Sequence, residues 1–386
     1  MNKIERIFKK SIEVFKECCL KNGAIVASDI YDPDYPKDVK WYGYVWPRDA
    51  SYVCYAADLL GLHEIPRKFF RWCWEYAEDL KEKGVFLYHK FYPNGRIAGD
   101  FDIGVRIKDL KNDKLVEFFK TQTKVKLFYS HFQPDQTGSL LWAIGEHSKF
   151  EDITDFENMI EKVADGICNF WKKDCFKIPS LDLWEEKASL PSLKQVHTYS
   201  LAMCAKGLEN AISLTKKPRE TWRKTLKEMK VMLQKCFVGK IGYFVKTYGK
   251  KIDRTVDSSA LGLVWPSAQF SVHDERIVKT VEKIVEMNCK NGGIQRYPKD
   301  RYDGKIMLGD LELNGAGAWP ILNFWLSIYF SIKGEKEKAL GYFNWVVERV
   351  EEKLPEQIKN GKPASIIPLA WSHAMFIIAG KFLKIF

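Results

Sequence analysis

The sequence lacks an uninterrupted apolar run long enough to form a membrane-spanning helix. Such a helix needs about 18 to 20 consecutive apolar residues. The first ten residues, MNKIERIFKK, are charged and amphipathic, and they contain no apolar core of the kind that defines a secretory signal peptide. These absences predict a soluble, cytoplasmic protein with no membrane partner.

Cysteine and histidine patterns that bind metals or form disulfide frameworks are also missing. The nine cysteines are odd in number, and no two of them form a Cys-x-x-Cys pair. The seven histidines show no His-Glu-x-x-His or other ligand spacing. No phosphate-binding glycine loop and no Gly-x-Ser-x-Gly nucleophile motif is present. We therefore expect a reduced protein that uses neither a metal nor another cofactor.

Like charges are nowhere concentrated, although the net charge is +11. Lysines alternate with acids, as in Lys336-Glu337-Lys338, and no run holds five or more like charges. A nucleic-acid-binding surface would gather its cations on one face or in one segment. The charge pattern instead indicates a solvated lysine-rich surface, and we expect no nucleic-acid partner.

Aromatic residues, in contrast, are abundant: they make up 14% of the chain and include 13 Trp. Indole rings have flat apolar faces and a polar edge, which suits a large core and equally the stacking of a pyranose ring. A hydrophobic content of 46% permits a substantial core. No Gly/Ser-rich or Pro-rich linker divides the sequence, so we expect residues 1–386 to form a single domain.

Apolar residues recur at helical spacing through most of the chain. Their recurrence at i, i+3 and i+4 between breakers predicts about twelve helices. A short β-ribbon is expected before the Pro-Asn-Gly turn at 93–95, over Val85–Tyr92. The segment Lys111–Lys126 is expected to be either an extra helix or an insertion. The predicted helices are Ile4–Cys19, Ala50–Leu60, Pro66–Lys81, Thr137–Glu146, Asp155–Trp171, Tyr199–Leu214, Glu220–Cys236, Ser258–Leu263, Glu275–Glu286, Trp319–Ile332, Glu335–Glu351 and Leu369–Phe382.

Polar and aromatic clusters fall in every second connection of this helix order. If successive helices run up and down, these connections all emerge at the same end of the array. Loops gathered on one rim of a rigid helical support are typical of an active site. The sequence therefore predicts an all-α barrel of helix pairs with its functional loops on one rim. The clusters are WPRD (46–49), QPDQT (133–137), DLWEE (182–186), DRTVD (253–257), GGIQRYPKDRYDG (292–304) and LPEQ (354–357).

Two acids in these clusters suit general acid–base chemistry. Inverting cleavage of a glycosidic bond needs one carboxyl group that protonates the leaving oxygen and another, about 6.5–9.5 Å away, that activates water. Glu185 lies between Trp184 and Glu186, and desolvation by the indole with repulsion by the second acid predicts a raised pKa. A pair of exposed acids at a helix start is the alternative. Glu356 is the candidate partner, with a solvent-facing loop acid as its alternative, and nothing in the residues themselves ranks it above Asp135 or Asp310.

Arginine beside tryptophan and aspartate forms a candidate sugar clamp. Arg48 and Asp49 follow Trp46-Pro47, so a guanidinium that donates to hydroxyls lies next to a carboxylate that accepts from them. A structural ion pair beside a helix start explains the same residues. Arg296 offers equivalent donor chemistry from another connection.

At these residues the sequence resembles the catalytic domain of glycoside hydrolase family 15, the glucoamylase group. The resemblance follows the family's order and spans nearly the whole chain. Its most specific part is the combination of DLWEE, LPEQ and PLAWSHA. The matching stretches are YVWPRDA (44–50), QPDQTGSLLWA (133–143), LDLWEE (181–186), RYPKDRYDG (296–304), LPEQ (354–357) and PLAWSHA (368–374).

The resemblance implies an (α/α)6 barrel and an inverting, exo-acting hydrolase that releases β-glucose from the non-reducing end of α-glucosides. It implies that Glu185 is the general acid and Glu356 the general base. It implies no cofactor and no metal, and the expected partner is a small oligosaccharide or disaccharide substrate. The non-reducing glucose would lie in a pocket lined by Trp46, Arg48, Asp49, Asp182, Trp184, Glu186 and Arg296.

The sequence also departs from the family pattern. Prokaryotic relatives carry a β-sandwich domain before the barrel, whereas the first motif here begins by residue 41, so we expect no such domain and expect short substrates. The Ser-Trp found in similar sequences is replaced around residues 98–102 by AGDFD, and Asn-Pro-Trp appears as GAWP (317–320). The alternatives are a trehalase or an α-1,6-glucosidase of the same family, a glycoside phosphorylase, and a non-catalytic glucan-binding domain.

Overall fold

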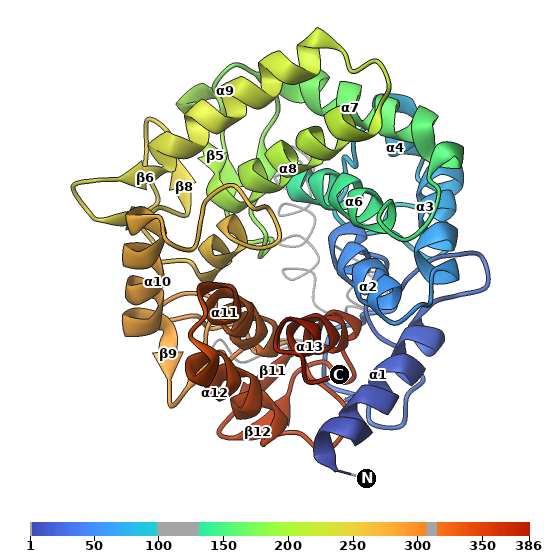
Figure 1. Cartoon of the computed structure of the whole chain (residues 1–386), viewed down its shortest axis with the longest axis vertical. Coiled ribbons are helices and arrows are strands. Elements are labelled where there is room, and N and C mark those ends of the chain that lie inside the picture. The colour runs from blue at the N-terminus through green and yellow to red at the C-terminus, as the bar shows by residue number, and fades with distance from the viewer. Residues whose placement is uncertain (1, 99–130, 306–314) are drawn as a thin grey trace, which may run out of the picture.

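Two concentric rings of helices build the protein (Figure 1), whose computed structural model describes residues 2–98, 131–305 and 315–386. Each inner element contacts the next, and α13 closes the ring against α2. The inner ring consists of α2 (Pro47–Leu59), α6 (Pro134–His147), α8 (Thr198–Leu214), the 3-10 helix η4 (Ser258–Leu263), α11 (Pro320–Lys333) and α13 (Ala370–Phe382).

Each inner element is backed by an outer helix. The outer helices bury one face only, as α9 does with Trp222, Met229 and Leu233, whereas α11 buries every residue from Pro320 to Phe330. A helix that is apolar all round must lie inside, and an amphipathic one must cover it. The predicted (α/α)6 barrel is confirmed. The outer helices are α1 (Lys3–Cys18), α3 (Glu64–Tyr76) with α4 (Glu78–Lys83), α7 (Glu157–Phe170), α9 (Glu220–Cys236), α10 (Glu275–Asn288) and α12 (Lys336–Val347).

Several predicted helices differ from those observed in their bounds or type, and two of these differences have a clear local cause. The range Pro66–Lys81 is divided into α3 and α4, because Ala77 between them has an extended backbone with ψ of 92°. The range Ser258–Leu263 is a 3-10 helix, whose first turn is capped by the Asp257 carboxylate through the Ser259 N–H. Among the described residues, none of the helices has both the length and the apolar character needed to cross a bilayer.

The β-ribbon predicted at Val85–Tyr92 forms only at its C-terminal end. There an isolated bridge pairs Phe91 with Ile97 across the Pro-Asn-Gly turn, and the Tyr92 N–H donates to the Arg96 carbonyl at 2.7 Å. Nearer Val85 the N–H groups donate to side chains: Phe86 to Thr137 Oγ1 at 3.0 Å and Leu87 to Asp79 Oδ2 at 2.6 Å. Because side chains take these donors, the pairing does not extend into a longer ladder. The Pro-Asn-Gly turn itself is present, with Gly95 at a φ of 83°.

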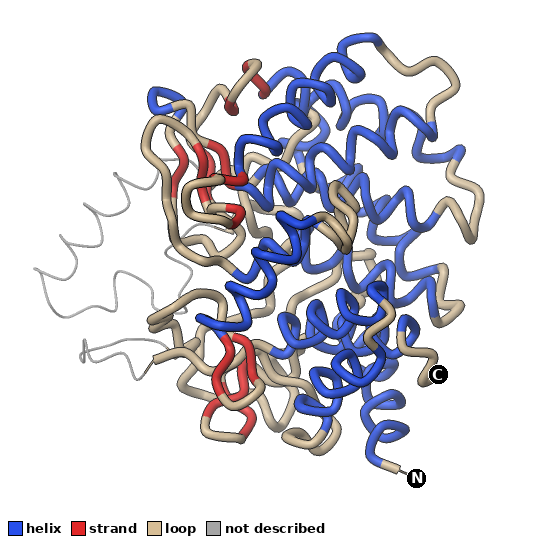
Figure 2. Tube along the Cα trace, turned by 60° about the vertical axis from the view of Figure 1, so that its left-hand side comes forward, coloured by secondary structure: helices blue, strands red, loops and turns tan. Residues whose placement is uncertain are grey.

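Short antiparallel ribbons occupy the connections between helices. Figure 2 shows the strands gathered at one side of the helical body. The β3–β4 ribbon frames the loop 182–187, which carries the predicted general acid. The predicted insertion at Lys111–Lys126 and residues 99–102 of the AGDFD stretch lie outside the described residues. The pairs are β1 (Trp171–Lys172) with β2 (Cys175–Phe176), β3 (Ser180–Leu181) with β4 (Ala188–Ser189), β5 (Val196–His197) with β8 (Thr247–Tyr248), β6 (Phe237–Val238) with β7 (Tyr243–Phe244), β9 (Cys289–Lys290) with β10 (Gly293–Ile294), and β11 (Gln357–Lys359) with β12 (Lys362–Ala364).

Candidate active site

A cavity of about 510 Å³ is lined by the connections that precede α2, α6, α8, α11 and α13. Its volume falls within the range of about 300–1,000 Å³ that is usual for small-molecule sites. The structure thus brings clusters far apart in the sequence to one cavity. Of the predicted site residues, those that line it are Trp46, Arg48, Asp49, Trp184, Glu185, Glu186, Arg296 and Glu356.

Asp182 is the predicted pocket residue that the structure places elsewhere. It is buried beneath the loop 182–187, where its carboxylate pairs with Lys246 Nζ at 2.5 Å. The same carboxylate accepts the N–H groups of Glu186 at 2.8 Å and Lys187 at 3.0 Å. Burial acts to raise the pKa of Asp182, but the Lys246 ammonium outweighs it and the pKa is lowered. Asp182 therefore holds the loop in place and does not face the cavity.

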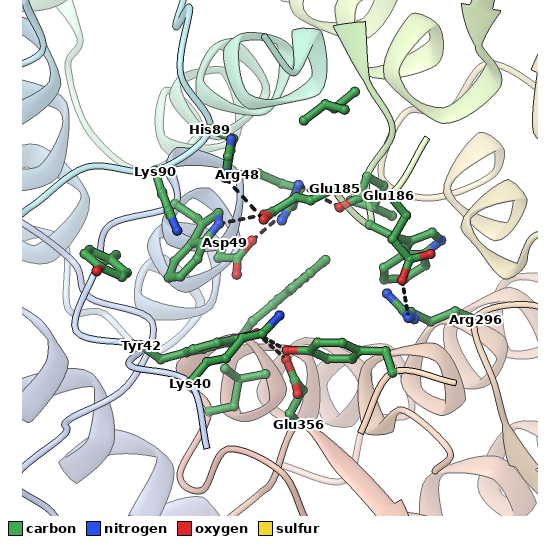
Figure 3. Close-up of a pocket in the computed structure, with 18 of the residues that line it drawn as sticks. Lys40, Tyr42, Arg48, Asp49, His89, Lys90, Glu185, Glu186, Arg296 and Glu356 are labelled. Carbon is green, nitrogen blue, oxygen red and sulfur yellow. Dashed lines mark hydrogen bonds and ion pairs between the residues drawn. The ribbon is translucent and has the colours of Figure 1, made fainter. Parts of the chain in front are cut away.

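Glu185 projects from the tip of this loop into the cavity (Figure 3). Its φ of 63° is in the left-handed region, which is uncommon for a residue with a side chain and needs support from its surroundings. The Trp46 indole supplies such support by donating to Glu185 Oε1 at 2.7 Å. His89 Nε2 lies 3.2 Å from Glu185 Oε2. Both carboxylate oxygens are thus held by nitrogen atoms from other parts of the chain.

The raised pKa predicted for Glu185 is contradicted. Partial removal from solvent does raise the pKa, but the charges of His89, Lys90 and Arg48 outweigh this effect, and the pKa of Glu185 lies below its usual value. The carboxyl group is held in surroundings that favour its ionised form.

Neither sequence neighbour acts on Glu185 as predicted, because the left-handed turn sends the three side chains in different directions. The Trp184 indole donates to the Asp257 carboxylate at 2.9 Å, beneath the loop. Glu186 pairs with Arg296 Nη2 at 2.7 Å, so its charge is compensated. The surroundings that the local sequence predicted for Glu185 are therefore absent from the tertiary structure.

Glu356 lies across the cavity from Glu185 (Figure 3) and is 2% exposed. The Tyr42 hydroxyl donates to Oε1 at 2.8 Å, and the Ser365 hydroxyl donates to Oε2. Tyr302 is joined to Tyr42 through their hydroxyls at 2.7 Å. Burial raises the pKa of Glu356, although the two donated hydrogen bonds act to lower it.

Arg48 and Asp49 form the wall nearest α2. Arg48 Nε donates to Asp49 Oδ1 at 3.0 Å, and Nη1 donates to Gln133 Oε1 at 3.0 Å and to Asp135 Oδ2 at 3.3 Å. Burial raises the pKa of Asp49 to about 6. The WPRD and QPDQT clusters are therefore one network, in which Arg48 positions the Asp49 carboxylate at the cavity.

Arg296 forms the opposite wall and is also nearly fully buried. Its Nε and Nη2 atoms donate to the two oxygens of Asp300, at 2.6 and 2.7 Å. The guanidinium lies over the rings of Trp319 and Tyr302, with centroids 5.1 and 4.9 Å away. Because this guanidinium also pairs with Glu186, Arg296 anchors the loop that carries Glu185 as well as lining the cavity.

Sequence reasoning missed several residues of the cavity. The aromatic run before WPRD was a signal for Tyr42 and Tyr44, since it continues the same connection. No local signal marked His89 or Lys246, which act through contacts with distant loops. The missed lining residues include Lys40, Trp41, Tyr42, Tyr44, His89, Lys90, His131, Tyr302, Trp319 and Trp371.

One group outside the cavity has the chemistry of metal ligands. Asp58, His63 and His147 place one ligand atom each within 4.8 Å of one another. The Nδ1 atoms of the two imidazoles lie 2.8 and 2.9 Å from Asp58 Oδ1. These are hydrogen-bond distances, so two N–H donors on one buried carboxylate account for the group without an ion.

The family profile described as Glycosyl hydrolases family 15 matches residues 17–351. An uncharacterized glycosyl hydrolase of Methanocaldococcus jannaschii is 31% identical over 98% of this chain and 56% of its own length. A trehalase of Mycobacterium tuberculosis is 23% identical over 92% of this chain and 51% of its own length. The chain thus spans about half the length of these curated relatives.

Among solved structures, a glycosidase variant in complex with glucose superposes with a TM-score of 0.74, covering 99% of this chain and 97% of that one. At 19% identity this likeness shows the fold alone. Membership rests instead on the profile match over most of the sequence and on the relative that is 31% identical. On that basis the chain belongs to glycoside hydrolase family 15.

Proposed function

We propose that residues 1–386 form one catalytic domain of an inverting, exo-acting α-glucoside hydrolase, which releases β-glucose from the non-reducing end of its substrate. The observation that carries the proposal is the placement of Glu185 and Glu356 on opposite sides of one cavity (Figure 3). An inverting enzyme needs its two carboxyl groups so placed, with room for a water molecule at the anomeric carbon.

In the proposed reaction, Glu185 protonates the glycosidic oxygen as the bond from C1 to that oxygen breaks. Glu356 takes a proton from a water molecule, whose oxygen bonds to C1 from the opposite face. Attack from that face converts an α-glucoside into β-glucose. The hydroxyls of Tyr42 and Ser365 support this role, because they fix both oxygens of Glu356.

The cavity walls offer the contacts that a glucose ring requires. Asp49, held by Arg48, presents a carboxylate to sugar hydroxyls. Trp46 and Trp319 supply apolar faces for the ring. The family match favours an α-linked glucose in this position, and short glucosides are the proposed substrates.

A trehalase-type activity is the second candidate, favoured by the Mycobacterium tuberculosis trehalase that matches 92% of this chain. An α-1,6-glucosidase shares the proposed mechanism and differs in which hydroxyl of the aglycone carries the glycosidic bond. A glycoside phosphorylase needs no general base, so the enclosed and hydrogen-bonded Glu356 weighs against it. The same residue weighs against a glucan-binding domain without activity.

The test is glucose release from maltose, isomaltose, trehalose and maltooligosaccharides, with and without phosphate. We expect turnover of at least one of them without phosphate, and proton NMR should detect β-glucose as the first-formed anomer. Initial α-glucose would reject inversion. A strict need for phosphate would indicate a phosphorylase. Absence of turnover with a folded protein would contradict the proposed activity.

A further inference from the structure

The surroundings of Glu185 do not favour the protonated form that a general acid needs. A general acid must carry a proton when the glycosidic oxygen reaches it. Yet the Trp46 indole donates to one oxygen of Glu185, and His89 Nε2 lies 3.2 Å from the other. Two donors on one carboxylate favour its ionised form, so a nearby group must supply the proton that Glu185 delivers.

His89 is placed to be that group. It is 2% exposed, and its ring stacks on that of His131 with centroids 5.3 Å apart and an interplanar angle of 22°. Its Nδ1 atom is enclosed and meets no hydrogen-bond partner within the described part of the chain. The ring is held by its stacking on His131 and directs Nε2 at Glu185.

Among the other groups around Glu185, Asp49 also has a raised pKa, of about 6, but its described side-chain hydrogen bond is to Arg48 and not to Glu185. The remaining groups do not offer a mobile proton. The guanidinium of Arg48 stays charged and is bonded to Asp49. The ammonium of Lys90 lies over the Tyr44 ring, 4.9 Å from its centroid. The indole N–H of Trp46 does not ionise, and Glu356 is across the cavity (Figure 3). Imidazole is the side chain that ordinarily exchanges a proton near neutral pH.

We propose that His89 is a positioning residue that supplies Glu185 with the proton for the leaving group. This inference rests on the proposed function. In the free enzyme His89 is an imidazolium, protonated on both Nδ1 and Nε2, beside the ionised Glu185. As the glycosidic bond breaks, the Nε2 proton crosses to Glu185 and then to the leaving oxygen. The pair is left as neutral His89 and ionised Glu185.

The remaining protons balance. Glu356 gains one proton from the attacking water and releases it to solvent after the product leaves. His89 takes up one proton from solvent, which restores the free enzyme. Over the whole cycle one water molecule is consumed and no net proton is gained or lost.

The test compares His89→Gln and His89→Phe with the wild type on two substrates. Gln keeps a neutral donor to Glu185, and Phe keeps the stacking on His131. One substrate is a disaccharide, whose alkoxide must be protonated to leave, and the other is α-glucosyl fluoride, whose fluoride leaves readily. At neutral pH we expect kcat on the disaccharide to fall by about 10²-fold, the lower range of a general-acid contribution. Turnover of the fluoride and both KM values should change little.

The loss in His89→Phe should shrink as the pH falls. The charge and hydrogen bond of His89 lower the pKa of Glu185, whereas burial raises it. Without His89 the pKa of Glu185 therefore rises, and solvent can protonate Glu185 directly under acidic conditions. His273→Gln, at an exposed position on the surface, is the matched control and should leave the rates unchanged. An equal loss on both substrates at every pH would show a merely structural role, and no loss on the disaccharide would also overturn the proposal.

A measurement without turnover separates this inference from the proposed function. Carbon-13 NMR of labelled glutamate should show Glu185 titrating at higher pH in His89→Phe than in the wild type. An unchanged titration would overturn the pairing of His89 with Glu185. Failure of the proposed function would look different: the folded wild type would hydrolyse neither the disaccharide nor the fluoride, while the titration would still decide the pairing.

Discussion

Trp46 donates its indole N–H to Glu185 Oε1 at 2.7 Å, across 139 residues of sequence. The bond joins the residue that precedes α2 to the loop between β3 and β4. One indole thus forms part of the cavity wall and also orients the proposed acid. Residues that line this cavity therefore hold one another in place, in addition to the contacts with a sugar that we propose for them.

Replacing either proposed catalytic carboxyl should abolish most activity without unfolding the protein. Glu185→Gln and Glu356→Ala should each lower kcat by several orders of magnitude, because each removes a proton-transfer group that contributes about 10²–10⁴-fold, together with its electrostatic effect. Steady-state rates and thermal unfolding check both expectations. A variant that keeps near-normal rates on the wild type's disaccharide would show that its residue has a different role.

Removing a hydroxyl donor from Glu356 should shift the acidic limb of the pH–rate profile. Ser365→Ala and Tyr42→Phe each delete a hydrogen bond that lowers the pKa of Glu356. The raising effect of burial is then less opposed, so the pKa of Glu356 rises further. A general base must be ionised, and the rate falls as the pH drops through its pKa. A hydrogen bond to a charged group contributes about 1.5 kcal/mol or more, so the limb should move to higher pH by about one unit. A limb that stays in place or moves to lower pH would contradict the assignment of Glu356 as the base.

Lys246→Met should destabilise the fold. Lys246 bridges Asp182 and Asp257 at 2.5 and 3.1 Å, and its removal leaves two buried carboxylates uncompensated. Breaking a buried ion pair in this way costs about 3–5 kcal/mol. Urea unfolding measures the change in stability. Lys187→Met is the control, because Lys187 is an exposed lysine on the loop 182–187, which also contains Asp182. Equal stabilities of the two variants would contradict the importance of the bridge.

Stability should also respond to pH through Asp79. Burial raises the pKa of Asp79 to about 6, above its usual value of about 3.9. Folding therefore favours the protonated form, and this contribution is lost as the pH rises from about 4 to about 6. Asp79→Asn should flatten the dependence of unfolding free energy on pH in this window, whereas Glu151→Gln, at an exposed position, should not. An unchanged slope in Asp79→Asn would refute the raised pKa.

Local patterns predicted most of the helices because helical spacing is a short-range property. The ranges for α8 and α9 differ from those observed by at most a residue, since both helices have clear apolar faces and breakers at their ends. The β-ribbon predicted at Val85–Tyr92 is confined to its C-terminal end for a long-range reason. The N–H groups of Phe86 and Leu87 donate to Thr137 and Asp79, and no local pattern shows that these side chains lie nearby.

The sequence by itself determined the helical barrel, the gathering of five of the six predicted connections at one cavity, and which two glutamates stand out. These features follow from periodicity, chain order and motif. Only the tertiary structure decided that Asp182 lies beneath the loop, that Glu186 is bound by Arg296, and that His89 meets Glu185. The physical reason is that burial and charge compensation act over a few ångströms in space. They depend on which distant residues the fold brings together.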